Sequence, residues 1–170
     1  MCGVIGCIGD NPVESVITGM KRMEYRGYDS YGFCAFKEDS KLLYKDVGII
    51  SQNTRLNGYA HTLKDYNSAI GHTRWATHGE VTKENAHPQH DKQETIFVVH
   101  NGTVDNSPAE MLDTQYIVQQ LKLRTTKHWM TIESKDRFTE GTRKNPLTTP
   151  EDYLLAVNAV AEKLEGDTHS

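Results

Sequence analysis

The sequence predicts an α+β domain in which one well-defined helix lies among several strands. The run GVIGCIG near the amino terminus is apolar, rich in branched residues and bounded by glycines, as expected of a buried strand. A helix with clear end signals follows it, and four later runs have the composition of strands. The 170 residues are 36% hydrophobic and 25% charged, which favours one ordinary globular domain with its own core over residues 1–170.

The first helix is predicted from its end signals and its periodicity. Asn11 stands at the N-cap position, Pro12 at the first helical position and Glu14 where it would close a capping box. Gly27 follows the expected end. The apolar positions have the spacing of a helix that lies on a sheet, and they are Val13, Val16, Ile17, Met20 and Met23.

The later part of the chain predicts more strands and two more helices. The strand candidates are SYGFCAF (30–36), KLLYKDVGII (41–50), SAIGHTRW (68–75) and ETIFVVHNG (94–102). A second helix is expected to begin at Ser107, Pro108 and Glu110, although a break around Asp113 leaves its start open. Its expected apolar face is Met111, Ile117, Val118 and Leu121. Residues 124–148 have no clean period apart from a short strand candidate at 128–134, and a last helix is predicted over 149–166.

Bulk composition disfavours several classes of function. The formal net charge is -4, so the chain has no excess of basic residues to attract a phosphate backbone, and we expect no direct nucleic-acid partner. No apolar run approaches the roughly 18 residues that a membrane span requires. The amino terminus has no positive region before its apolar run, and three cysteines form neither an even set nor a CxxC pair. These features predict free thiols in a cytoplasmic protein.

The segment GHTRWATHGEVTKENAHPQH raises the question of a metal site, because it contains His72, His78, His87 and His90. Zinc requires ligands that converge tetrahedrally. Neither His72 with His78 nor His87 with His90 has the spacing of a helical i, i+4 pair or of a zinc finger. The residues alone therefore disfavour a metal site but leave it open.

Cys2 stands directly after the initiator methionine, and its small side chain permits removal of that methionine. Removal would leave a thiol and a free α-amine on one residue. A free α-amine has a reference pKa of about 8, so it can accept a thiol proton and later donate it to a leaving amine. The alternative is that Cys2 is a small buried residue at the start of a strand.

Asn101 and Gly102 favour the catalytic interpretation of Cys2. A nucleophile that attacks a carbonyl needs oxyanion donors, and a side-chain amide followed by a backbone N–H at a strand end can supply them. Asn-Gly by itself is weak support, since it is also a common hairpin turn. The catalytic interpretation of Cys2 therefore has to be judged from the other motifs in the sequence.

Five motifs occur in the order and near the spacing of one known family. They are MCGVIGCIG, GMKRMEYRGYDSYGF, GHTRWATHGE, ENAHPQH and VVHNGTVDN, and they extend from residue 1 to about residue 106. The chain thereby resembles the class II glutamine amidotransferases, and looks most like the glutaminase domain of the glucosamine-6-phosphate synthases. The resemblance implies an N-terminal-nucleophile hydrolase fold, an αββα sandwich of two packed sheets flanked by helices, with neither a cofactor nor a metal.

The resemblance also implies roles for individual residues. Mature Cys2 would attack the carboxamide of L-glutamine, Asn101 and Gly102 would hold the oxyanion, and water would hydrolyse the glutamyl thioester after ammonia leaves. Arg74 would bind the α-carboxylate of glutamine and Asp113 its α-ammonium. The other implied residues are Thr77 and His78 on the substrate side, Trp75 in a loop that closes over glutamine, and Arg26 and Gly27 beside the nucleophile.

Three of these assignments have structural alternatives. Asp113 lies in MLDTQ, where the family has an acidic, threonine-rich run, and at about half the usual interval from Asn101, so it is also explicable as a helix cap. Trp75 stands at a strand end, which is also typical of a core residue. YRGYDS is also typical of a helix C-cap and turn, in which Gly27 supplies a permissive backbone and Asp29 a turn hydrogen bond.

The chain is shorter than the family's glutaminase domains and stops where strands that finish the second sheet are expected. An incomplete second sheet would expose an edge, which favours pairing with another chain, including a second copy. With no acceptor domain in residues 1–170, an active glutaminase would supply ammonia to a separate synthase subunit. The alternatives are a stand-alone amidohydrolase and a non-catalytic domain that binds glutamine or a partner protein.

Overall fold

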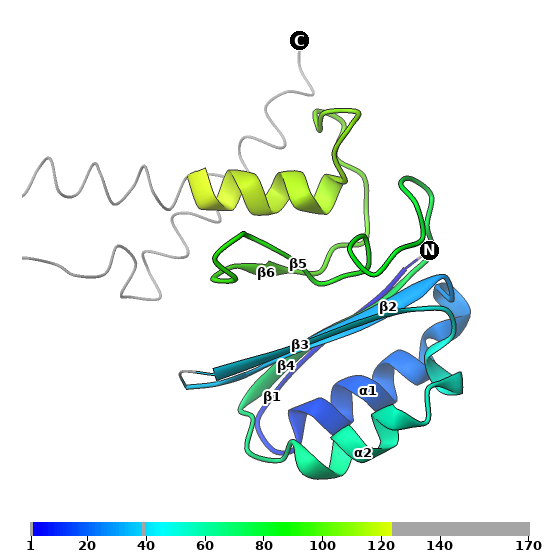
Figure 1. Cartoon of the computed structure of the whole chain (residues 1–170), viewed down its shortest axis with the longest axis vertical. Helices are drawn as coiled ribbons and strands as arrows, with labels where there is room; N and C mark the ends of the chain where they lie inside the picture. Colours follow the sequence, from blue (N-terminus) through cyan, green and yellow to red (C-terminus); the bar gives the residue numbers. More distant parts are fainter. Residues whose placement is uncertain (1, 39, 124–170) are drawn as a thin grey trace, which may run out of the picture. The chain divides into compact units, whose positions relative to one another are not determined.

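The computed structural model describes residues 2–38 and 40–123, which belong to two compact units (Figure 1). The first unit runs to His90 and includes Phe97–Gly102, and the second contains Asp91–Ile96 and the chain from Thr103. The strand candidate at 128–134 and the helix candidate over 149–166 lie outside the described residues. The organisation of 1–170 as a single domain stays a prediction.

A four-stranded antiparallel sheet, in the order β1-β4-β2-β3, forms the centre of the first unit. Its strands are β1 (Gly3–Ile8), β2 (Ser30–Lys37), β3 (Ser40–Val47) and β4 (Ser68–Arg74). The corresponding strand predictions are confirmed, but β3 ends before residue 50 because Gly48 takes a left-handed φ of 90°. The order brings the start of β1 beside the end of β4.

Two helices cover one face of this sheet, α1 (Pro12–Arg22) and α2 (Arg55–Thr62) (Figure 1). α1 begins at Pro12 as predicted, and it buries Val13, Val16, Ile17 and Met20. The predicted capping box is wrong. Asn11 has a left-handed backbone, with φ 49° and ψ 48°, and its side chain makes no cap hydrogen bond. A capping side chain needs the extended backbone that Asn11 lacks.

The short helix α2 was not predicted from the sequence. Its segment RLNGYAHT contains a glycine and has no strong apolar period, so local propensity favours it weakly. Leu56 is nevertheless fully buried, and Tyr59 packs on the same core. Tertiary burial therefore stabilises α2.

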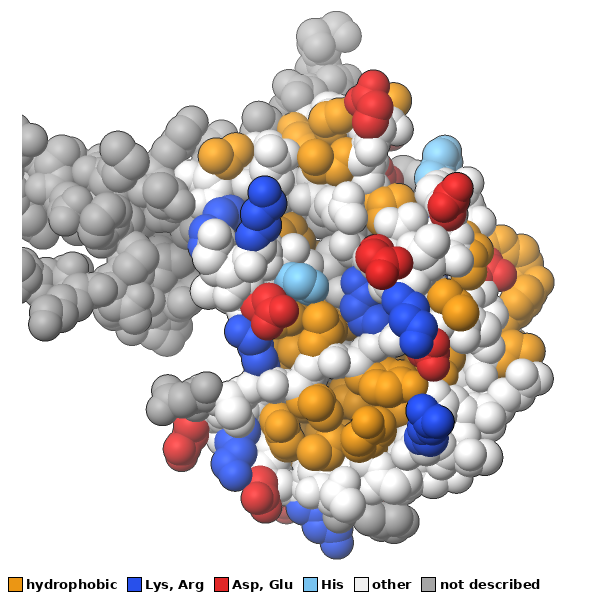
Figure 2. Space-filling model, viewed as in Figure 1, with side chains coloured by type: hydrophobic (Ala, Val, Ile, Leu, Met, Phe, Trp, Pro, Cys, Tyr) orange, Lys and Arg blue, Asp and Glu red, His pale blue; other side chains and the backbone are white. Residues whose placement is uncertain are grey.

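The core of the first unit lies between the sheet and these helices, where Figure 2 shows hydrophobic side chains gathered. Phe33 of β2 is fully buried there, and so are Ile50 and Leu56, which belong to the same hydrophobic core. Gly71 of β4 permits close packing, because a Cβ at this position would lie 2.5 Å from Val16 Cγ1 and 2.8 Å from Met20 Sδ. A larger residue at 71 would push α1 away from the sheet.

The opposite face of the sheet carries a short two-stranded sheet of β5 (Gln89–His90) and β6 (Phe97–Val98). The Phe97 ring packs on Phe36 of β2, with ring centroids 5.5 Å apart. The predicted strand over 94–102 is thus limited to Phe97–Val98. Residues before it form a turn instead, since the Asp91 carboxylate accepts hydrogen bonds from the Thr95 and Ile96 N–H groups, at 2.6 and 2.8 Å.

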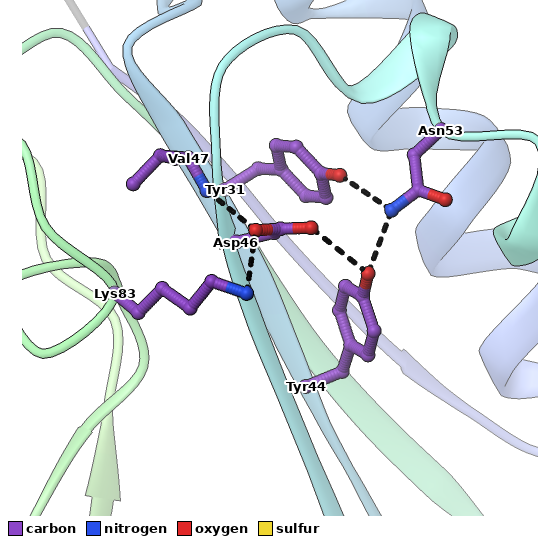
Figure 3. A network of polar contacts seen from close by, with 6 residues as sticks. All are labelled: Tyr31, Tyr44, Asp46, Val47, Asn53 and Lys83. Atoms are coloured by element: carbon purple, nitrogen blue, oxygen red, sulfur yellow. Dashed lines mark hydrogen bonds and ion pairs between the residues drawn. The ribbon is translucent and has the colours of Figure 1, made fainter.

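A polar network ties the loop after β4 to the rim of the main sheet (Figure 3). Asn53 Nδ2 donates to the hydroxyls of Tyr31 and Tyr44 at 2.8 and 2.6 Å. The Tyr44 hydroxyl then donates to Asp46, whose carboxylate lies 2.9 Å from Lys83 Nζ on that loop. Burial raises the pKa of Tyr31 to about 12, so its hydroxyl stays neutral and accepts from Asn53 at ordinary pH.

The second unit contains a helix over 113–123. It begins at Asp113 and not at Ser107, because residues before it form turns, with Met111 N–H donating to the Pro108 carbonyl at 3.0 Å. Tyr116 and Val118 are buried, while Lys122 lies 3.0 Å from the Asp91 carboxylate. Among the helices described in the two units, none has the length and apolar character needed to cross a membrane.

Candidate active site

Cys2 lies where β1 begins beside the end of β4. The antiparallel register sets Gly3 opposite Thr73, so the residue before Gly3 reaches the residues that follow Thr73. Accordingly, the Trp75 backbone N–H donates to Cys2 Sγ at 3.4 Å, and the Cys2 thiol donates to the Trp75 carbonyl at 3.7 Å. The thiol is therefore held by backbone groups of the motif HTRWATHG.

Asn101 contacts the backbone of Cys2. Cys2 N donates to Asn101 Oδ1 at 3.2 Å. Because a backbone N–H can only donate, this contact orients the amide with Oδ1 toward Cys2 and leaves the two Nδ2 protons for other acceptors. The predicted pair of nucleophile and oxyanion donor is thus brought together across 99 residues of chain.

His72 of β4 anchors the backbone that leads to Asn101. Its Nε2 lies 3.0 Å from the His100 carbonyl oxygen, and since a carbonyl only accepts, Nε2 carries the proton. His72 is fully buried, and burial lowers its pKa to about 4, so the imidazole is neutral at pH 7. A neutral buried ring thereby holds the turn of Asn101 and Gly102 on the sheet.

A pocket of about 590 Å³ opens at this point of the first unit. That volume lies within the usual range of small-molecule sites. Its lining joins the start of β1, the end of α1 with the segment after it, and the segment after β6: Cys2, Gly3, Val4, Met23, Tyr25, Arg26, Val99, His100 and Asn101. Arg26, predicted to border the nucleophile, is therefore in the same lining as Cys2.

Arg74 ends β4 and organises the loop that follows. It is only 5% exposed, and its guanidinium donates to the carbonyls of Glu80, at 3.2 Å, and His78. Burial lowers its pKa, an effect opposed by the nearby Cys2 and Asp29. Two of its five N–H donors bind the loop. Its predicted contact with a substrate carboxylate stays a prediction.

The other residues predicted to surround the substrate are on the loop after β4 and are exposed. Trp75 is 42% exposed and lies against Tyr28, with ring centroids 5.2 Å apart, which argues against a core role. Thr77 and His78 are exposed, and His78 Nδ1 lies 3.3 Å from Thr77 Oγ1. Arg74 and these three loop residues are outside the lining of the pocket that contains Cys2.

Gly27 lies directly on the backbone at the end of β4. A Cβ there would be 2.6 Å from the Arg74 carbonyl carbon, 2.7 Å from the Thr73 oxygen and 2.8 Å from Trp75 N. Its φ of -169° is extended and open to any residue. The interpretation of Gly27 as a permissive turn is therefore wrong: glycine is required for close approach between the motifs YRGYDS and HTRWATHG.

Asp113 belongs to the second unit, at the first residue of the helix over 113–123. Its carboxylate accepts hydrogen bonds from Val104 N at 3.0 Å and from Ser107 Oγ at 2.5 Å. Both contacts are local and organise the loop before the helix. The predicted contact of Asp113 with a substrate ammonium group stays a prediction.

His72 and His87 form a buried pair on the face of the sheet away from the helices, with ring centroids 4.1 Å apart. Burial, reinforced by the neighbouring His72, lowers the pKa of His87 to about 2. Across residues 2–38 and 40–123, no group of three or more His, Cys, Asp or Glu side chains is arranged to hold a metal ion. His72 and His87 thus serve packing and backbone support in this segment.

Sequence reasoning missed several residues of the site. Met23 and His100 line the pocket although neither was predicted to do so. Asp29, interpreted as a local turn residue, binds the backbone of Ala76 on the loop after β4, with the Ala76 N–H 2.8 Å from Asp29 Oδ2. These contacts join segments that are distant in sequence. The only sequence signal for them is that the residues involved lie in the five family-like motifs.

Comparison with known proteins finds relatives among the glutamine–fructose-6-phosphate aminotransferases. The chain is 35% identical over 171 residues to the glutamine–fructose-6-phosphate aminotransferase (isomerizing) of Methanococcus maripaludis, covering 98% of this chain and 27% of that protein. It is 46% and 44% identical over 108 residues to the enzymes of that name from Thermotoga maritima and Chlamydia muridarum, covering 62% of this chain and 17% of each relative.

The chain thus spans between 17% and 27% of the length of these relatives. No family model matches it. The alignment with the Methanococcus maripaludis enzyme nevertheless extends over almost the whole chain. The chain therefore belongs to the family of class II glutamine amidotransferases.

Proposed function

We propose that this chain hydrolyses L-glutamine to glutamate and ammonia through a thioester on Cys2. The observation that carries the proposal is the contact of Cys2 N with Asn101 Oδ1 at 3.2 Å, at a pocket of about 590 Å³. Cys2 and Asn101, the proposed nucleophile and oxyanion donor, both line this ligand-sized pocket, which supports the proposal. The names of the relatives, glutamine–fructose-6-phosphate aminotransferases, support glutamine as the substrate.

The first half of the reaction forms the thioester. Removal of Met1 exposes the α-amine of Cys2, which takes the proton from Sγ as the sulfur attacks the carboxamide carbon of glutamine. The carbonyl electrons move to oxygen, which accepts hydrogen bonds from Asn101 Nδ2 and the Gly102 N–H. The tetrahedral intermediate collapses and the amine leaves as ammonia, with the proton returned by the Cys2 ammonium group.

The second half releases glutamate. Water gives a proton to the Cys2 α-amine as it adds to the thioester carbonyl, and the same donors hold the new oxyanion. The carbon–sulfur bond then breaks, and the ammonium group returns the proton to Sγ to restore the thiol. Ammonia and glutamate are then the only products. We propose that the ammonia passes to a synthase, either a separate subunit or a further part of a longer protein, because the relatives are aminotransferases much longer than this chain.

Selectivity for glutamine is proposed to come from groups that match its two charged ends. Arg74 retains three N–H donors beyond the two that bind the loop, which suits bidentate binding of an α-carboxylate. Asp113 is proposed to bind the α-ammonium, with Thr77 and His78 on the substrate side. Trp75 is proposed to belong to the loop that closes over the substrate, and Arg26 and Gly27 to border the nucleophile.

The finer fold proposed is the αββα sandwich of N-terminal-nucleophile hydrolases. In the first unit, α1 and α2 cover one face of the four-stranded sheet, while β5 and β6 pack on the other face. A helix layer, a sheet and the beginning of a second sheet are consistent with this architecture.

The test is glutamate release from L-glutamine by purified protein whose intact mass shows that Met1 is absent. We expect release that is lost in Cys2→Ala and kept in Cys7→Ala, since Cys7 lies farther along the same strand and packs against the core. Circular dichroism must show that both variants fold. A folded, processed wild-type chain that releases no glutamate would contradict the proposal.

A further inference from the structure

Asp29 brackets Trp75 by binding the peptide groups on both sides of it. The Asp29 N–H donates to the Arg74 carbonyl at 3.1 Å, and the Ala76 N–H donates to Asp29 Oδ2 at 2.8 Å. The Asp29 carbonyl in turn accepts from Gly48 N at 2.7 Å, which joins this residue to the end of β3. Asp29 therefore determines the path of the chain through Trp75.

The residues before Asp29 support the same contact. Gly27 lies against the backbone of Thr73, Arg74 and Trp75 so closely that a Cβ would have no room. Tyr28 packs its ring on the Trp75 side chain. The three consecutive residues thus hold both the backbone and the side chain of Trp75.

Trp75 presents its own backbone to the sulfur of Cys2. Its N–H donates to Sγ at 3.4 Å, and its carbonyl lies 3.7 Å from Sγ. An N–H donor stabilises a thiolate more than a thiol, because a hydrogen bond to a charged acceptor is the stronger one. From this geometry we infer that Asp29 is a positioning residue, which acts through Trp75 to hold a backbone N–H on the Cys2 thiolate.

The acceptor role of Asp29 is separable from its charge. The groups near the thiol that carry or gain charge are the Cys2 α-amine after removal of Met1, Arg74 on β4, Asp29, and the pocket residue Arg26. The carboxylate of Asp29 is negative and opposes a thiolate, whereas its hydrogen bond to Ala76 supports the thiolate through Trp75. Removing charge and removing the acceptor therefore have opposite expected effects.

The test compares Asp29→Asn, which keeps an oxygen acceptor for the Ala76 N–H, with Asp29→Ala, which removes it. The probe is the rate of Cys2 alkylation by iodoacetamide at pH 7, followed by peptide mass spectrometry, with Cys7 and Cys34 as internal references. We expect Asp29→Asn to alkylate at least as fast as the wild type. Asp29→Ala is expected to be slower by on the order of tenfold, the effect of a hydrogen bond to a charged group.

A matched control is Asp65→Ala, which removes an exposed aspartate that pairs at 3.3 Å with Lys37, at the end of β2 opposite to the end that pairs with Arg74. Its Cys2 alkylation rate should equal that of the wild type. Alkylation that is unchanged in folded Asp29→Ala, or that falls equally in Asp29→Asn, would overturn the inference. In the first case the hydrogen bond between Asp29 and Ala76 does not affect the reactivity of Cys2. In the second case the reactivity depends on the charge of Asp29.

A second measurement needs no variant. Hydrogen exchange on the wild-type protein should find the Ala76 amide protected, although its neighbours Trp75 and Thr77 are exposed. Rapid exchange at Ala76 would overturn the inference even if Asp29→Ala failed to fold.

The inference rests on the proposed function only in treating Cys2 as a nucleophile. Where glutamine hydrolysis is measured, kcat should fall in Asp29→Ala with little change in KM and should be restored in Asp29→Asn. A chain that releases no glutamate but shows the expected alkylation pattern would refute the glutaminase proposal and leave the role of Asp29 intact.

Discussion

At the scale of single residues, Asn101 makes two different contributions with one amide group. Its Oδ1 accepts from Cys2 N, while Nδ2 is proposed to hold the oxyanion. Asn101→Asp keeps an oxygen for Cys2 and removes the donor. We expect kcat for glutamate release to fall by about 10²- to 10³-fold, the usual effect of losing one oxyanion donor, measured by steady-state kinetics.

The matched control for this prediction is Asn57→Asp on α2. It makes the same chemical change on an exposed side chain that accepts a hydrogen bond from Lys21 at 2.7 Å. Its kcat should remain that of the wild type. An Asn101→Asp protein with wild-type kcat would exclude Asn101 as an oxyanion donor.

At the scale of elements, the packing of α1 on β4 depends on the absence of a side chain at Gly71. Gly71→Ala would introduce a Cβ at 2.5 Å from Val16 and 2.8 Å from Met20. Overpacking of this kind destabilises by about 1–3 kcal/mol. We expect a loss of that size in the free energy of unfolding, measured by urea denaturation.

Gly6 of the neighbouring strand β1 provides the comparison. A Cβ there would have its nearest neighbours at 3.9 Å, an ordinary contact distance. Gly6→Ala should therefore leave the free energy of unfolding unchanged or slightly higher. Equal effects of the two substitutions would show that the contact between α1 and β4 is not the cause.

At the scale of the whole molecule, the buried histidine pair makes stability depend on pH. The pKa of His72 is lowered to about 4 and that of His87 to about 2, against about 6.5 in the unfolded chain. Between pH 6.5 and 4 the unfolded state thus binds more protons than the folded one. The contribution of the two histidines to the free energy of unfolding should be fully present above pH 6.5 and fall with decreasing pH. The slope of this fall should approach about 1.4 kcal/mol per pH unit for each histidine.

The measurement is the free energy of unfolding by urea at pH 7.5, 6.5 and 5.5. His72→Gln supplies an amide donor for the His100 carbonyl but does not titrate, so the slope should be about half that of the wild type. The lowered pKa of Asp46 and of Asp91 affects stability only at more acidic pH, outside this window. A stability that is constant from pH 7.5 to 5.5 would contradict the prediction.

Much of the first unit follows from local patterns in the chain. Four strands and α1 were predicted because apolar periodicity and turn residues act between neighbours, and β1 and α1 begin where the pattern indicates. Cys2 and Asn101 were predicted because their chemistry is specific and their motifs are family-like. Helix α2 was missed because its stability comes from the burial of Leu56 and not from its own propensity.

The sequence by itself determined which residues could react and which segments could form strands or helices, since both depend on side-chain type and short spacing. Only the tertiary structure decided how Cys2, Trp75 and Asn101 meet, because sheet register sets Gly3 opposite Thr73. It also decided that Asp29 acts 47 residues away, on Ala76, and not within its own turn. Such contacts depend on strand order and close backbone approach, which leave no periodic signal in a single chain.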